Sequence, residues 1–309
     1  MSDSTPAPAH SALPDLGRVG LWTSAFDFLP IAQLRETAAE LDELGYGALW
    51  FGETVGREAL TQALLILESA PRIPVATGIA NLWARDAVAM NGGARTLRDA
   101  HPGRFLLGLG VSHAPLVEGL RPGGNVYDKP LSLMRRYLDG LDSALYFAAG
   151  GEQPRPPRVL AALGPRMLDL ARDRAEGAHT YLVTPQHTAD ARTILGPDKY
   201  LAVEQGAVLT TDRETALRRG REHLKPYLNL PNYRNNWLRL GLTEADLADG
   251  GSERLVDALV VWGDEATIRA RVDEQFAAGA DHVCLQVLGE SMVDLTIEDW
   301  RRLAPALLT

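Results

Sequence analysis

Eight short apolar segments alternate with segments of helical periodicity along almost the whole chain. The apolar segments lie at residues 18–24, 48–51, 74–80, 104–110, 158–163, 178–183, 201–209 and 281–288. Between them apolar residues recur at helical spacing, as Leu34, Ala38 and Leu41 do. Eight strand–helix units in a chain of 309 residues are the count of a closed barrel. We therefore predict an α/β fold, a single (β/α)8 TIM barrel with insertions.

A doubly wound sheet is the rival architecture for alternating strands and helices. Its nucleotide-binding fingerprint is Gly-x-Gly-x-x-Gly leading directly into a helix. Here Gly108 and Gly110 are followed by His113 at the third glycine position, and Ala114-Pro115 come next. The fingerprint is therefore incomplete, which favours the barrel.

Two parts of the chain fall outside the strand–helix alternation. Residues 1–16 are rich in Pro, Ala and Ser and lack the basic start and apolar block of a signal peptide, so we predict a flexible tail. Residues 17–309 then form the barrel, with an insertion of short helices near 228–258. Residues 113–128 hold several Gly and Pro and form a loop long enough to be a lid.

Composition excludes several classes of function. The net charge is −9 and no long basic run occurs, so we expect no nucleic acid partner. No stretch of about 18 apolar residues predicts a membrane span, and a cytoplasmic location is expected. The single cysteine, Cys284, lies in an apolar run and is expected in the core. The histidines show no metal-ligand spacing, so no metal is predicted.

The segment 105–110 is the most informative of the eight strands. It is apolar and reads as a strand that is buried on both faces. Gly110 leaves its backbone open to close approach, and Ser112 and His113 follow at the carboxyl end, where barrels place their chemistry. His113 is a candidate for proton transfer, or alternatively a structural histidine at a loop entrance.

Strand ends elsewhere supply further candidates. Leu163 and Gly164 end a strand and Pro165 begins a helix, so free N–H groups converge there with the positive end of the helix dipole. A phosphate fits that position, and Arg166 adds charge; the alternative is a plain tight turn. Aromatic and amide side chains beyond other strand ends are candidates for a wall of an apolar substrate pocket: Trp22, Asn81 and Trp83.

Three motifs, in this order along the chain, resemble the luciferase-like monooxygenase superfamily. They are residues 102–110 (PGRFLLGLG), residues 161–167 (AALGPRM) and residues 176–185 (EGAHTYLVTP). The likeness covers roughly residues 17–290 and is nearest to the branch of oxidoreductases that depend on coenzyme F-420. The resemblance implies a barrel that binds FMN or the deazaflavin coenzyme F-420, often as a homodimer.

The resemblance also implies roles for individual positions. Thr77, Gly78 and Ile79 match a third-strand bulge that backs the flavin ring, with a cis peptide bond between Gly78 and Ile79. The cofactor phosphate loop corresponds to residues 162–166, namely Ala162, Leu163, Gly164, Pro165 and Arg166. Gly110, Ser112 and Thr184 are further expected cofactor contacts.

One position departs from the family pattern. Several deazaflavin enzymes carry Asp-His where this chain has Glu53-Thr54, and threonine is no general base near neutral pH. Glu53 is a candidate replacement, or it caps a helix or pairs with an arginine. The departure disfavours alcohol oxidation and favours reduction or monooxygenation of a small organic molecule.

The sequence thus predicts an oxidoreductase that transfers a hydride between coenzyme F-420 and a small-molecule substrate, with His113 and Glu53 as the candidate catalytic residues. Two alternatives remain open. One is an FMN-dependent luciferase-like monooxygenase, and the other is a barrel that binds the cofactor without catalysis.

Overall fold

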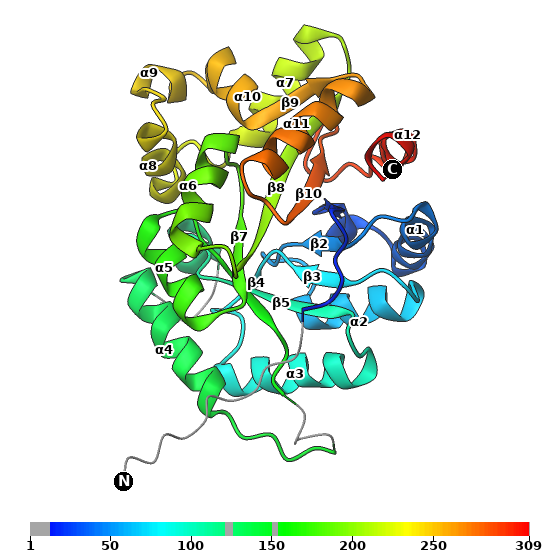
Figure 1. The fold of residues 1–309 in the computed structure, drawn as a ribbon, viewed down its shortest axis with the longest axis vertical. Coiled ribbons are helices and arrows are strands. Elements are labelled where there is room, and N and C mark those ends of the chain that lie inside the picture. Colours follow the sequence, from blue (N-terminus) through cyan, green and yellow to red (C-terminus); the bar gives the residue numbers. More distant parts are fainter. Residues whose placement is uncertain (1–12, 121–125, 150–153, 309) are drawn as a thin grey trace.

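Parallel strands alternate with helices through the part of the chain that the structure describes. This computed structural model describes residues 13–120, 126–149 and 154–308 (Figure 1). Its strands are β1 Val19–Trp22, β2 Leu49–Phe51, β3 Val75–Thr77, β4 Ala80–Asn81, β5 Phe105–Gly110, β6 Arg158–Ala161, β7 Gly177–Thr180, β8 Tyr200–Leu209, β9 Val260–Gly263 and β10 His282–Val287.

The helices begin and end at residues whose chemistry favours those positions. Asp86, Asp212 and Asp264 each cap a helix by accepting a backbone N–H bond, and Gly45 ends the first α-helix at φ 85°. The α-helices are α1 Ile31–Leu44, α2 Ala59–Ser69, α3 Ala87–Ala100, α4 Pro130–Ser143, α5 Pro165–Arg174, α6 Pro185–Leu195, α7 Arg213–Leu224, α8 Pro231–Arg239, α9 Glu244–Leu247, α10 Glu253–Leu259, α11 Glu265–Ala277 and α12 Ile297–Leu307. A 3-10 turn covers Ala25–Phe28 and a π-helical turn covers Pro115–Leu120.

The strands close into a barrel. Their order is β10-β1-β2-β3-β5-β6-β7-β8, and β8 pairs with β10 to complete the ring. All of these pairings are parallel, as in Val19↔Val283 between β1 and β10. The predicted (β/α)8 barrel is therefore confirmed, and the doubly wound sheet is wrong. β5 is buried along its whole length, as predicted.

Side chains fill the barrel interior rather than leaving a channel. One buried cluster comprises Trp22, Ala48, Trp50, Ala76, Leu106, Val159, Ala202 and Cys284, together with Leu16 from the segment before β1. Trp50 Nε1 donates to His282 Nε2 at 3.0 Å, and His282 Nδ1 lies 2.9 Å from the Gly17 carbonyl oxygen. The expected tail thus ends earlier than residue 16: Leu16 is 2% exposed, while residues 1–12 lie outside the described residues.

The insertion near 228–258 forms a small second core. Its helices α8, α9 and α10 lie together at one end of the molecule, beside α6 and α7 (Figure 1). Trp237 is fully buried, and its Nε1 donates to the Leu182 carbonyl at 3.1 Å, which fixes the insertion to the end of β7. β9 was not predicted; it pairs with the part of β8 from Gly206 to Leu209. α4 ends at Ser143, and Phe147, four residues further along the chain, is 90% exposed.

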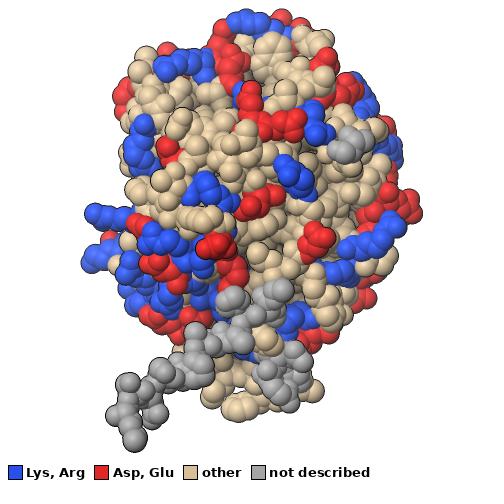
Figure 2. All heavy atoms as spheres, viewed as in Figure 1, with Lys and Arg blue, Asp and Glu red and all other residues tan. Residues whose placement is uncertain are grey.

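The surface carries mixed charge. Acidic and basic side chains are interspersed over the face shown in Figure 2. Among the described helices none is both long and apolar enough to cross a bilayer.

Candidate active site

The break between β3 and β4 is the most unusual backbone feature at the barrel mouth. The peptide bond between Gly78 and Ile79 is cis, as expected. Thr77 Oγ1 donates to the Gly108 carbonyl at 2.8 Å and accepts from the Gly108 N–H at 2.9 Å, which ties this segment to β5. Trp22 Nε1 donates to the Gly78 carbonyl at 3.0 Å. The bulge is therefore held from both sides.

The glycines of β5 make room for this bulge. A Cβ at Gly108 would lie 1.9 Å from the Thr77 carbonyl oxygen, and a Cβ at Gly110 would lie 2.4 Å from Ile79 Cγ1. The close approach that we predicted at these glycines is thus made by the neighbouring segment of the chain. A cofactor contact at Gly110 remains a prediction.

Glu53 is fully engaged in structural contacts. Its carboxylate accepts from the N–H groups of Ala59 at 3.1 Å and Asn81 at 2.7 Å. It also pairs with both guanidinium nitrogens of Arg85, one of them at 3.0 Å. The structure realises the arginine-pairing alternative, and a carboxylate with four donors is poorly placed to act as a base.

Asn81 and Trp83, predicted to line the substrate pocket, shape the loop after β4. Asn81 is 1% exposed, and its Oδ1 accepts from the Trp83 N–H at 3.0 Å. Trp83 is partly exposed, its Nε1 donates to the Val111 carbonyl at 3.0 Å, and its ring lies 6.4 Å from that of Tyr127. Trp83 is therefore exposed enough to contact a ligand. The buried Asn81 instead fixes the conformation of the loop after β4.

Aromatic side chains from distant segments meet above the barrel interior. We call Tyr181, Tyr227 and Tyr233 the tyrosine cluster. The Tyr181 ring lies 5.2 Å from Trp22 and 5.7 Å from Tyr227, and Tyr227 lies 5.0 Å from Tyr233. Trp22 is 8% exposed, so it supports this cluster more than it lines open space.

His113 joins the same cluster. Its ring lies 5.6 Å from that of Tyr233. Burial lowers its pKa to about 4, so the imidazole is neutral at neutral pH and its protonated form is disfavoured. Ser112 precedes it at φ 58°, and the Ser112 carbonyl accepts from the Tyr127 hydroxyl at 3.1 Å.

The N-terminus of α5 has the features of an anion site. Its N-cap, Gly164, offers no side-chain hydrogen bond to the first turn. A Cβ at Gly164 would have Arg239 Nη2, at 3.9 Å, as its nearest neighbour. Arg239 comes from the insertion and is exposed, as is Arg166. Free backbone donors, the helix dipole and the Arg239 guanidinium thus lie together, which suits a phosphate.

The turn before α6 lies next to the N-terminus of α5. Thr184 caps α6 by accepting the His187 N–H at 3.3 Å, and His187 Nε2 lies 2.9 Å from the Leu163 carbonyl. Ala162 is 3% exposed and its N–H donates to the His179 carbonyl at 3.1 Å. Contacts of Ala162, Leu163, Pro165 and Thr184 with a cofactor remain predictions.

Sequence reasoning missed several polar residues of the site. Tyr181 lay inside the predicted strand 178–183, whereas β7 ends at Thr180, so Tyr181 is in fact a residue just beyond a strand end. Glu204 interrupts an apolar strand and is 0% exposed; a charged residue inside an apolar run is an informative signal. Arg239 and Tyr233 lie in the insertion, where no periodic pattern connects them to the barrel.

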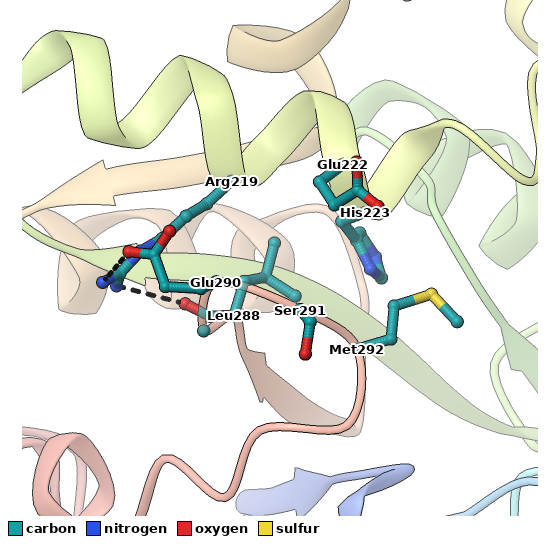
Figure 3. A pocket seen from close by; sticks show the side chains of 8 residues that line it. Arg219, Glu222, His223, Leu288, Glu290, Ser291 and Met292 are labelled. Carbon is teal, nitrogen blue, oxygen red and sulfur yellow. Dashed lines mark hydrogen bonds and ion pairs between the residues drawn. The ribbon is translucent and has the colours of Figure 1, made fainter.

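Two further observations concern metal binding and the surface beside the mouth. Within residues 13–120, 126–149 and 154–308, no group of three or more His, Cys, Asp and Glu side chains has metal-binding geometry. A small, partly open depression lies to one side of the mouth, between α7 and the segment after β10, and His223 is among its lining residues (Figure 3).

The model of the luciferase-like monooxygenase family matches residues 10–282. The chain belongs to this family. Its membership agrees with the barrel, with the bulge after β3 and with the class of oxidoreductases.

Individual relatives of this luciferase-like protein are more distant. A Mycobacterium tuberculosis protein named as a coenzyme F-420-dependent oxidoreductase is 31% identical over 122 residues, which is 40% of this chain and 35% of that protein. The match thus spans about a third of the relative's length.

Solved structures show the same fold at low sequence identity. An F-420-dependent secondary alcohol dehydrogenase, in complex with an F-420–acetone adduct, superposes with a TM-score of 0.71 at 14% identity, over 96% of this chain and 99% of that one. The oxygenating constituent of 3,6-diketocamphane monooxygenase from Pseudomonas putida, with FMN, gives 0.67 at 15% identity, over 93% and 95%.

Proposed function

We propose that this protein is an oxidoreductase that transfers a hydride between coenzyme F-420 and a small organic substrate. The observation that carries the proposal is the uncapped N-terminus of α5, beside Arg239 and at the same barrel end as the tyrosine cluster. The Mycobacterium tuberculosis relative, which is named as a coenzyme F-420-dependent oxidoreductase, supports the choice of cofactor.

One group of residues would hold the phosphate end of the cofactor, and another would enclose its redox ring. The backbone donors at Gly164 and Arg166, with the Arg239 guanidinium, would hold a phosphate. The Gly78–Ile79 bulge and the aromatic side chains above it would enclose the redox ring. When bound, the deazaflavin supplies the hydride chemistry, and the protein supplies orientation and exclusion of water.

A binding titration tests this proposal. Fluorescence titration of the purified protein with F-420 and, separately, with FMN should give saturable binding of F-420. Arg239→Ala should weaken binding about tenfold or more, because a charge-assisted hydrogen bond contributes roughly 1.5–3 kcal/mol. Arg136→Ala, an exposed arginine on α4, is the matched control and should bind as the wild type does. Equal affinity in Arg239→Ala would reject the phosphate site.

An FMN-dependent monooxygenase is the second candidate, and the family to which the chain belongs favours it. Binding of FMN without binding of F-420 in the same titration would decide for this candidate. Binding of neither cofactor would reject both.

A further inference from the structure

Three buried polar side chains form a row of hydrogen bonds between the barrel and its helices. We call Gln205 on β8, Gln275 on α11 and Thr188 on α6 the glutamine chain; each is at most 1% exposed. Val203 and Ala207, two residues to either side of Gln205, pack in the core between the sheet and the helices. Side chains two apart on a strand share a face, so Gln205 points outward, towards the helices. Polar groups in such an apolar layer are costly unless they are hydrogen-bonded.

Two backbone carbonyls fix the direction of the glutamine chain. Gln205 Nε2 donates to the carbonyl oxygens of Gly206 at 2.9 Å and Leu259 at 3.1 Å. A carbonyl oxygen only accepts, so the amide nitrogen of Gln205 must lie on that side and its Oε1 on the other. Gln205 Oε1 accepts from Gln275 Nε2 at 2.9 Å, and Gln275 Oε1 accepts from the Thr188 hydroxyl at 2.6 Å. The orientation of each amide therefore fixes the next group, as far as the Thr188 hydroxyl.

One end of the glutamine chain lies in the first turn of α6. The Thr188 N–H donates to the Thr184 carbonyl at 3.1 Å. The preceding residue is His187, whose Nε2 lies 2.9 Å from the Leu163 carbonyl oxygen, so Nε2 carries the proton of this hydrogen bond. Leu163 directly precedes Gly164, the N-cap of α5. The turn that Thr188 holds is thus bonded to the N-terminus of α5.

The other end of the glutamine chain meets the insertion. Leu259, whose carbonyl accepts from Gln205, is the last residue of α10. The insertion also supplies Arg239, the last residue of α8, whose Nη2 would lie 3.9 Å from a Cβ at Gly164. The proposed phosphate site therefore takes its backbone donors from α5 and its guanidinium group from the insertion. The glutamine chain is bonded towards both of these parts.

This connection matters because the phosphate donors come from separate parts of the fold. Donors from two elements bind an anion well only if their spacing is already fixed in the free protein. Apolar packing alone tolerates small shifts between neighbouring elements. A buried network of satisfied hydrogen bonds instead specifies a single arrangement, because each bond has a preferred direction and an unbonded group is costly.

We propose that Thr188, Gln275 and Gln205 are positioning residues for the phosphate site, a role that rests on the proposed function. They fix the first turn of α6, and through it the N-terminus of α5, relative to the insertion that carries Arg239. All three are too deeply buried to touch the cofactor. They act on binding of the phosphate group and not on binding of the redox ring, which would lie at the Gly78–Ile79 bulge.

The first test needs no cofactor. Hydrogen–deuterium exchange of the apoprotein measures how firmly the first turn of α6 is held. Thr188→Val, which keeps the shape of the side chain but has no hydroxyl, should lower the protection of these amides roughly tenfold. Thr188→Ser keeps the hydroxyl and should be protected as the wild type is. Thr193→Val is the matched control, because Thr193 is exposed on the same helix and its hydroxyl donates to the Ala189 carbonyl of that helix. Equal protection in Thr188→Val and the wild type would overturn the proposal.

The second test separates positioning of the phosphate site from a general role in folding. Fluorescence titration gives the affinity for F-420 and for the deazaflavin that lacks the phosphate group. Thr188→Val and Gln275→Met should each weaken F-420 binding about tenfold and leave binding of the phosphate-free deazaflavin unchanged. Thr188→Ser and Thr193→Val should bind both compounds as the wild type does. Equal losses for the two compounds, or no loss for either, would overturn the proposal.

The same titrations distinguish failure of this inference from failure of the proposed function. A wild type that binds FMN but not F-420 would reject the proposed cofactor. The comparison would then use FMN and riboflavin, which differ only by the phosphate, and a selective loss of FMN binding in Thr188→Val would still support the positioning role. A wild type that binds each phosphorylated cofactor no better than its phosphate-free counterpart would overturn that role.

Discussion

At the scale of single residues, the Glu53–Arg85 pair should contribute to stability only as a pair. The side chains of Glu53 and Arg85 are 4% and 10% exposed. Removing one partner of a buried ion pair leaves an unpaired charge, which costs about 3–5 kcal/mol. We expect Arg85→Met to lower the free energy of unfolding by about that amount, and Glu53→Gln by less, because Arg85 keeps its ion pair with Glu58 at 2.6 Å. The double variant should lose less than the sum, as urea denaturation would show; additive losses would contradict a coupled pair.

Two glycines that look alike in the sequence should respond oppositely to alanine. A Cβ at Gly108 would meet the Thr77 carbonyl oxygen at 1.9 Å, whereas nothing lies within 4 Å of a Cβ at Gly92 in α3. Gly108→Ala should therefore destabilise the protein by about 1–3 kcal/mol or more, because backbone must move. Gly92→Ala should stabilise it by up to about 1 kcal/mol through helix propensity. Thermal unfolding distinguishes them, and a harmless Gly108→Ala would mean that the bulge does not press on β5.

Single residues could be predicted only where their role is local. Cys284 was predicted to be in the core because it lies within an apolar strand, and it is 0% exposed. Glu53 was left open between catalysis and pairing because its partner, Arg85, is 32 residues away. Glu204 was missed because the strand was judged by its apolar majority rather than by its one acid.

At the scale of secondary structure elements, the first turn of α5 gives a prediction that separates stability from binding. Gly164 already has N-cap geometry, with φ −88° and ψ 154°. Gly164→Asp should fold at least as stably as the wild type, because Asp caps a helix better by a few tenths of a kcal/mol. Its carboxylate would occupy and repel a phosphate, so F-420 affinity should fall more than tenfold. Gly164→Ala is the control for size, and undiminished binding in Gly164→Asp would place the phosphate elsewhere.

Elements were predictable where apolar period and end signals agree. Each of the eight barrel strands overlaps an apolar run of the sequence, so their positions could be predicted. β9 was missed because Val260 and Val261 directly follow the predicted short helices and precede the Asp264 cap, which leaves only four residues. β9 pairs with the part of β8 that extends beyond its pairing with β7. No local sequence pattern indicates this extension.

At the scale of the whole molecule, the barrel followed from the count of strand–helix units, but the contents of its mouth did not. Tyr181, Tyr227 and Tyr233 come from a strand end, a loop and the insertion, and only closure of the ring brings them together. Trp237 holds the insertion over β7 by one hydrogen bond to Leu182. The insertion thus helps to form the barrel mouth. Its sequence shows no regular apolar pattern from which its position against the barrel could be predicted.

The buried titratable groups predict how the stability of the whole fold depends on pH. Burial lowers the pKa of His179 to about 3 and those of His223 and His282 to about 4. Below pH 6.5 these histidines bind protons in the unfolded chain, whereas in the folded protein they stay neutral. Stability should therefore fall as pH drops from 6.5 towards 4, by up to about 1.4 kcal/mol per pH unit for each histidine.

Glu204 acts in the opposite sense at higher pH. Its folded pKa is raised from 4.5 to about 8, so the folded state holds a proton that the unfolded state has lost, and this contribution to stability is lost as pH rises through that window. The free energy of unfolding should therefore pass through a maximum near pH 6.5. In Glu204→Gln the decline between pH 6.5 and 8 should be absent, and the acid limb between pH 4.5 and 6.5 should be steeper because Glu204 no longer opposes it, which urea denaturation at each pH would show. An alkaline decline that survives in Glu204→Gln would mean that the buried carboxyl group is ionised in the native barrel, because a protonated Glu204 is what ties stability to pH in that range.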